Sequence, residues 1–204
     1  MSTVEIISND ISEPIILIRD YPVESMSGIL NKNLFSGEHK TQYDYSYEPT
    51  VKKQCKNIQS QNIPNLSTDA ILFASQNCDK EMSNFLTMAS KRKYWGEPSI
   101  MIYNETGFMT RHKDRAPVNE ETGRPLNDGL LISVNLGLSC LFSFRKSNGE
   151  IFTTIIPHGS VLIFDAVMTE HAVKVIPNSY ESEENSVLKN FRLSVISRQS
   201  LKSV

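Results

Sequence analysis

The sequence has few cysteines, no excess of basic residues and no long hydrophobic run. Its three cysteines, Cys55, Cys78 and Cys140, lie far apart with no C-x-x-C spacing, which argues against a disulfide framework and against a zinc site built on cysteine. A formal net charge of -2 argues against a surface that holds nucleic acid by phosphate contacts alone. The apolar run PIILI is far too short to span a membrane, and no positively charged signal segment precedes it. We therefore expect an intracellular protein, cytoplasmic or nuclear, with no membrane segment and no obligate protein partner.

The chain is long enough for one core. With 204 residues, of which 39% are hydrophobic, we predict a single domain over residues 1–204. PIILIRDY predicts a strand, and the PVESMSGILNKNLF that follows has the apolar spacing of a helix. Residues 36–66 are polar and bounded by proline, which predicts a hairpin and a mobile loop. STDAILFASQNCDKEMSNFLTMASKRK predicts one or two helices, with Ser67 and Thr68 as possible caps.

Residues 98–199 have a different character. Short runs rich in valine, isoleucine and phenylalanine alternate with glycine, asparagine and proline: SIMIY, LLISVNLGLSCLFSF, EIFTTIIP, GSVLIF, HAVKVI and FRLSVIS. Strands of about five residues in such a series are typical of a sandwich or jelly roll. We therefore predict an α+β, mainly β fold in which an early helical half precedes a β core at 98–199.

TRHKDRAP places His112 two residues before Asp114, next to a predicted strand. Side chains two residues apart on an extended chain share a face, so the imidazole and the carboxylate would point at one spot. A metal bound there needs a third ligand, and His171, which opens the predicted strand HAVKVI, is the natural candidate. Two histidines and one carboxylate leave about three coordination positions open, as in the facial triad of non-haem Fe(II) oxygenases. A surface pair in a polar loop is the alternative explanation of H-x-D.

FRLSVISR carries two arginines on one face. Strand alternation places Arg192, Ser194, Ile196 and Arg198 on the same side. Burying the arginines would be very costly without anions, because an unpaired interior charge is strongly disfavoured. A dianionic ligand would satisfy both, since guanidinium suits bidentate binding of a carboxylate. The alternative is an exposed edge strand with two solvated arginines.

These residues together resemble the AlkB-type branch of Fe(II)/2-oxoglutarate dioxygenases. The resemblance covers roughly residues 94–199, and more loosely reaches back to about Gln42. It implies a double-stranded β-helix, which is a jelly roll with N-terminal helices packed on one sheet. The motifs that carry it follow one another along the chain as Tyr103, His112-x-Asp114, His171 and Arg192-x-Ser194-x-x-x-Arg198.

The resemblance assigns roles to these residues. It implies that iron is held by His112, Asp114 and His171. It also implies that the 2-oxoglutarate site is formed by Arg192 at the distal carboxylate, Arg198 at the proximal carboxylate, and by Tyr103 and Ser194.

TQYDYSY resembles the family's nucleotide-recognition lid, which we place at about 36–66. An extended chain would present Tyr43, Tyr45 and Tyr47 as one aromatic row for stacking a base, although one side of a packed sheet is the alternative. Lysines that could meet phosphates lie nearby at positions 40, 52, 53 and 56.

Two positions depart from the family's pattern. Many base-repair members carry an acidic residue where this chain has Ala116. The residue two after the first arginine is often asparagine, and here it is Ser194. The first departure bears on the substrate, and the second has little effect on cofactor binding.

The implied activity is oxidative demethylation of N-alkylated bases in DNA or RNA, on a single-stranded or flipped base. Fe(II), 2-oxoglutarate and O2 would be the cofactors, and succinate, CO2 and formaldehyde the products. Two alternatives stay open. The same chemistry on a protein side chain or small molecule is favoured by the pI near 6.1 and by Ala116. A non-catalytic jelly-roll binding module would hold a sugar or a structural metal. A zinc hydrolase is weaker because it gives the two arginines no role.

Overall fold

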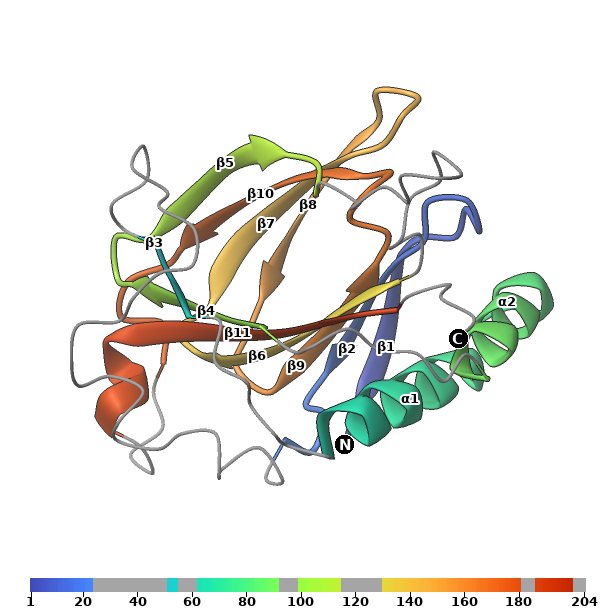
Figure 1. The fold of residues 1–204 in the computed structure, drawn as a ribbon, viewed down its shortest axis with the longest axis horizontal. Helices are drawn as coiled ribbons and strands as arrows, with labels where there is room; N and C mark the ends of the chain where they lie inside the picture. The colour runs from blue at the N-terminus through green and yellow to red at the C-terminus, as the bar shows by residue number, and fades with distance from the viewer. Residues whose placement is uncertain (24–50, 55–61, 92–98, 115–129, 181–185, 200–204) are drawn as a thin grey trace, which may run out of the picture.

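A computed structural model describes residues 1–23, 51–54, 62–91, 99–114, 130–180 and 186–199. Within these residues the strands form two antiparallel sheets, one of seven strands and one of four, that face each other (Figure 1). The larger sheet has the order β1-β2-β9-β6-β11-β4-β3, and the smaller has the order β5-β10-β7-β8. The predicted mainly β jelly roll with helices packed on one sheet is confirmed.

The elements have the following bounds. The larger sheet contains β1 (Thr3–Ser8), β2 (Ile15–Arg19), β3 (Val51–Gln54), β4 (Ser99–Asn104), β6 (Leu131–Gly137), β9 (Ser160–Phe164) and β11 (Phe191–Arg198). The smaller sheet contains β5 (Phe108–His112), β7 (Cys140–Arg145), β8 (Ile151–Ile156) and β10 (Glu170–Val175). The helices of the described residues are α1 (Asn62–Ser75), α2 (Lys80–Ser90) and a short 3-10 helix (Ser186–Lys189).

The predicted strands are present, but two strands of the larger sheet were not predicted. The runs from SIMIY to FRLSVIS form β4 and β6 to β11, and PIILI forms β2. β1 and β3 lie at the two edges of the larger sheet. β3, with the sequence VKKQ, lies in the segment that we expected to form a hairpin and a loop, and it pairs with β4. Edge strands carry polar residues because one side faces water, so their hydrophobic pattern is weak.

The helical segment forms two helices, and the predicted caps of the first one were wrong. α1 begins at Asn62, so Ser67 and Thr68 lie inside it. The helix includes Pro64 in its first turn, where a missing N–H costs little. α2 begins after Asp79, whose carboxylate accepts the Met82 N–H at 2.9 Å. No helix of the described residues is long and apolar enough to cross a membrane. The helix predicted over PVESMSGILNKNLF lies outside the described residues.

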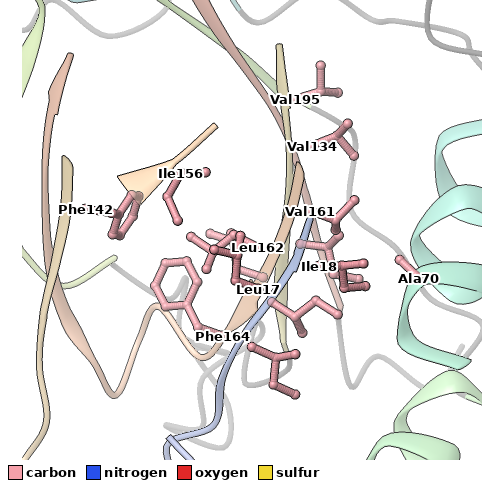
Figure 2. Close-up of a cluster of buried hydrophobic side chains, with 14 of the residues drawn as sticks. Leu17, Ile18, Ala70, Val134, Phe142, Ile156, Val161, Leu162, Phe164 and Val195 are labelled. Carbon is pink, nitrogen blue, oxygen red and sulfur yellow. The ribbon is translucent and has the colours of Figure 1, made fainter. Parts of the chain in front are cut away.

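The central strands of the larger sheet are buried on both faces. Every residue of β6 and β9 is buried. Figure 2 shows why: Val134 and Val195 point to the side where Ala70 of α1 lies, whereas Phe142 and Phe164 lie between the sheets. No described helix packs on the smaller sheet, and β7 and β8 alternate between residues that face the larger sheet and residues that face outward. The inner layer between the sheets is where inward polar side chains can form a site.

Gly137 ends β6 in a place that admits no side chain. Its φ is +80°, and a Cβ there would lie 2.1 Å from the carbonyl oxygen of Phe191. Gly149 has a similar φ of +87° with no atom within 4 Å of such a Cβ. The two positions share the left-handed backbone, but Gly137 is buried and crowded whereas Gly149 is exposed and open.

We expect Gly149→Ala to lower the free energy of unfolding by about 1 kcal/mol, from left-handed strain alone. Gly137→Ala should cost about 2 kcal/mol more, because the new methyl group overlaps a backbone atom. Urea unfolding of both variants measures the difference. Equal losses would show that the crowding at Gly137 is absent in solution.

Candidate metal centre

The two strands that carry the histidines pair with each other. His112 ends β5 and His171 lies at the start of β10, and the two residues are direct partners in the ladder. Their ring centroids are 4.3 Å apart. Asp114 follows β5 and is held by a hydrogen bond from its N–H to the Ala166 carbonyl at 2.9 Å. One ligand atom from each of the three side chains lies within 4.8 Å of the other two, so the structure brings the predicted triad together.

Backbone carbonyls orient both imidazole rings. Nδ1 of His112 lies 2.7 Å from the Thr110 oxygen, and Nδ1 of His171 lies 3.2 Å from the Thr169 oxygen. A carbonyl oxygen only accepts, so Nδ1 carries the proton and the lone pair of the neutral ring is on Nε2. The Nε2 atoms of His112 and His171 lie 3.6 and 3.9 Å from Oδ1 of Asp114. Both lone pairs are therefore directed at the same place as a carboxylate oxygen.

His171 is buried among aromatic rings. Phe142 stacks on it with centroids 5.8 Å apart, and Phe164 meets it edge-on at 5.1 Å. Burial lowers the pKa of His171 to about 4. The ring is therefore neutral at pH 7, which is the form that binds a metal.

Asp114 uses its two oxygens differently. Oδ2 accepts two hydrogen bonds from Arg198, from Nε at 3.0 Å and from Nη2. Oδ1 faces the two histidines. Burial alone would raise the pKa of Asp114, but the contact with His112 and the charge and hydrogen bonds of Arg198 hold it well below its usual range. Two imidazoles and an ionised carboxylate form a donor set of nitrogen and oxygen that fits Fe(II).

A cavity that opens to solvent lies beside the triad, and the space in it together with the adjoining solvent amounts to about 570 Å³. Its lining includes the triad and three of the four residues expected at the cosubstrate, which are Tyr103, Ser194 and Arg198. The rest of the wall is mainly apolar, with Met101, Met109, Phe142 and Val173. The cavity thus combines a metal-binding wall, one guanidinium and an apolar surface.

Arg192 does not line this cavity. It is 0% exposed, and its Nη1 donates to the carbonyl oxygens of Leu138 at 3.1 Å and Ile156 at 3.4 Å. Nη2 donates to Oδ1 of Asn135 at 2.5 Å. Among the described residues, Nε is buried without a hydrogen-bond partner and no carboxylate pairs with the guanidinium. An interior cation that meets only neutral acceptors fits a ligand with a negative charge.

Asn135 and Ser133 were not predicted as site residues. Both lie on the inner face of β6, and each is buried. The signal was present, because they are polar residues at alternate positions of the otherwise apolar run LLISVNLG. Polar groups on the inward face of a buried strand require partners, so they mark a site.

The predicted substrate residues lie outside the described residues. These are Tyr43, Tyr45, Tyr47 and Ala116, together with the lysines at positions 40 and 56. Of the predicted lid at 36–66, the structure describes β3 and the first residues of α1.

No protein-family model and no curated protein match the sequence. Among solved structures the chain is similar to OsALKBH1, with a TM-score of 0.63 and 14% identity over 91% of this chain and 97% of that chain. It is also similar to a prolyl-4-hydroxylase of Pseudomonas putida, with a TM-score of 0.50 and 11% identity over 98% of this chain and 92% of that chain. A 2OG-Fe(II) oxygenase family protein from Burkholderia pseudomallei matches at a TM-score of 0.40 and 16% identity, over 74% of this chain and 66% of that chain, which is too distant to carry an argument.

At these identities the likeness shows the fold. It is the fold that this chain shares with OsALKBH1 and with the prolyl-4-hydroxylase. Within that fold, the triad of His112, Asp114 and His171 fits Fe(II), and the cavity with Arg198 in its wall fits 2-oxoglutarate and O2.

We expect His112→Ala to weaken metal binding by more than about tenfold, because one of three ligands is lost. Isothermal titration with Mn(II), which is stable in air, measures the affinity. His158→Ala is the matched control, because His158 accepts the Gly137 N–H and packs on Tyr180 outside the cavity. Equal affinities for both variants would exclude the triad as the metal site.

Proposed function

We propose that the chain is an Fe(II)- and 2-oxoglutarate-dependent dioxygenase. The observation that carries the proposal is the convergence of His112, Asp114, His171 and Arg198 on one cavity of a double-stranded β-helix. Fe(II) held by the triad would have about three positions for the cosubstrate and O2. When bound, the iron would promote the reaction of O2 with 2-oxoglutarate, in which 2-oxoglutarate is converted to succinate and CO2 and the substrate is hydroxylated.

In this proposal the two arginines bind the dianion. Arg198 contributes positive charge beside the metal ligand Asp114, next to the carboxylate that approaches the metal. Arg192 serves the distal carboxylate, because its buried charge has no carboxylate partner among the described residues. Tyr103 is the partner of Arg192 across β4 and β11, and it lines the cavity with Ser194.

The apolar part of the cavity wall would exclude water and orient the substrate. Met101, Met109, Phe142 and Val173 present few groups that hold water. The wall would thereby exclude bulk water from the metal site and hold the substrate group beside it by shape. In this proposal the triad binds the metal, and the apolar wall orients the substrate.

For the substrate, we propose an N-alkylated base in DNA or RNA. The support is the order and spacing of the site residues, which resemble the AlkB-type branch, and the tyrosine row at 43–47. Hydroxylation of an N-methyl group yields a product that loses formaldehyde. The second candidate is the same chemistry on a protein side chain or a small molecule, which the apolar wall and the net charge of -2 favour.

Incubation with Fe(II), ascorbate and 2-oxoglutarate should produce succinate, and His112→Ala should reduce this to the background without enzyme. Mass spectrometry of succinate measures the turnover. His158→Ala should retain it, since His158 lies outside the cavity. A folded, metal-binding wild type that neither forms succinate nor binds 2-oxoglutarate would exclude the dioxygenase.

The substrate class follows from formaldehyde release in parallel reactions. With N-methylated single-stranded DNA or RNA, we expect formaldehyde in amounts that match the succinate formed above the uncoupled level. Methylated peptides are the competing arm. Release from peptides alone would reject the nucleic-acid proposal while leaving the dioxygenase intact.

A further inference from the structure

Asn135 joins the cavity wall to Arg192. It lies in β6, is 1% exposed, and is the ladder partner of Ser194 in β11. Its Oδ1 accepts three hydrogen bonds: from Nη2 of Arg192 at 2.5 Å, from Oγ of Ser133 at 3.1 Å and from Oγ of Ser194 at 3.2 Å. Ser133 and Ser194 line the cavity, whereas Arg192 does not. One amide oxygen therefore links both serines of the wall to the buried guanidinium.

The orientation of this amide is defined by its nitrogen. Nδ2 donates to the carbonyl oxygen of Ser133 at 2.8 Å and to that of Ser160 at 3.3 Å. Since carbonyl oxygens only accept, the amide cannot be turned without losing these bonds and placing its NH2 against Arg192. Oδ1 is thus held toward the guanidinium by contacts in β6 and β9.

The acceptors around Arg192 leave its charge uncompensated. The Leu138 and Ile156 carbonyls and the Asn135 amide are all neutral. An aspartate has the shape of asparagine, and at position 135 it would form an ion pair with the guanidinium. The neutral amide orients Arg192 through a hydrogen bond and leaves the charge for another anion.

We propose that Asn135 is a positioning residue that holds Arg192 for the carboxylate of 2-oxoglutarate remote from the metal. Because the Asn135 amide is neutral, the positive charge of Arg192 remains available to bind an anion. This inference rests on the proposed function. It also gives a reason for Ser194 two positions after Arg192, where asparagine is often found in the family that the sequence resembles: here the amide comes from the facing residue of β6.

The decisive variant is Asn135→Asp. Its melting temperature without ligands serves as the check that it folds: the ion pair with Arg192 stabilises the variant, whereas its second carboxylate oxygen faces the Ser133 and Ser160 carbonyl oxygens and destabilises it. We expect its affinity for 2-oxoglutarate in the presence of Mn(II) to fall by about tenfold or more, because the new carboxylate competes with the ligand. Isothermal titration measures the affinity without turnover. Affinity within about twofold of the wild type would overturn the proposal.

Asn148→Asp is the matched control. Asn148 is exposed in the β7–β8 turn, where its side chain accepts the Glu150 N–H. The Asn148→Asp substitution adds the same negative charge away from the cavity, so the affinity for 2-oxoglutarate should stay at the wild-type value. A loss as large as that of Asn135→Asp would assign the effect to net charge and overturn the proposal.

A swap across the strand pair tests the position of the amide. Asn135→Ser should raise the KM for 2-oxoglutarate by about tenfold with a smaller change in kcat. The double variant Asn135→Ser with Ser194→Asn returns an amide from β11 and should recover most of the loss. A folded double variant with the KM of the single one would overturn the positioning role. Mn(II) affinity should be unchanged throughout, because the triad is untouched.

Binding of 2-oxoglutarate to the wild type distinguishes a failure of the proposed function from a failure of the role of Asn135. If metal-loaded wild type does not bind 2-oxoglutarate, the proposed function fails. If it binds and Asn135→Asp binds equally well, only the role of Asn135 fails.

Discussion

The hydrogen bonds from Arg198 to Asp114 join the two sheets in the lining of the cavity. Arg198 ends β11 of the larger sheet, and Asp114 follows β5 of the smaller sheet. By occupying Oδ2, the guanidinium turns Oδ1 toward the histidines, whose rings are fixed by backbone carbonyls. The metal centre therefore depends on a contact between elements 84 positions apart in the sequence. Packing of the two sheets positions one residue from each.

Arg198 in the cavity wall and Arg192 behind it have opposite electrostatic surroundings. Arg198 is part-buried and paired with a carboxylate, so its charge is largely compensated. Arg192 is fully buried and meets only neutral acceptors among the described residues. A buried charge without a counter-ion lowers the stability of the fold, and binding of an anion relieves that cost. The lower stability that we expect from the unpaired charge of Arg192 agrees with a site that binds a dianionic ligand.

The parts that sequence patterns predicted are those with strong periodicity. Runs of valine, isoleucine and leucine predicted the buried strands β2, β6, β9 and β11, and apolar residues three and four apart predicted the helices. β1 and β3 were missed because edge strands need little hydrophobicity. The caps at Ser67 and Thr68 were wrong because a proline in the first turn does not stop a helix that begins before it. Asn135 was overlooked although its polarity in LLISVNLG was visible.

The sequence by itself determined the mainly β class, the residue types of the triad and the shared face of Arg192 and Arg198, because these follow from local alternation along a strand. Only the tertiary structure decided that His112 and His171 face each other and that Arg198 pairs with Asp114. It also decided that Arg192 is held by Asn135 behind the cavity wall. The physical reason is that register and sheet packing come from contacts between distant strands, which local periodicity does not encode.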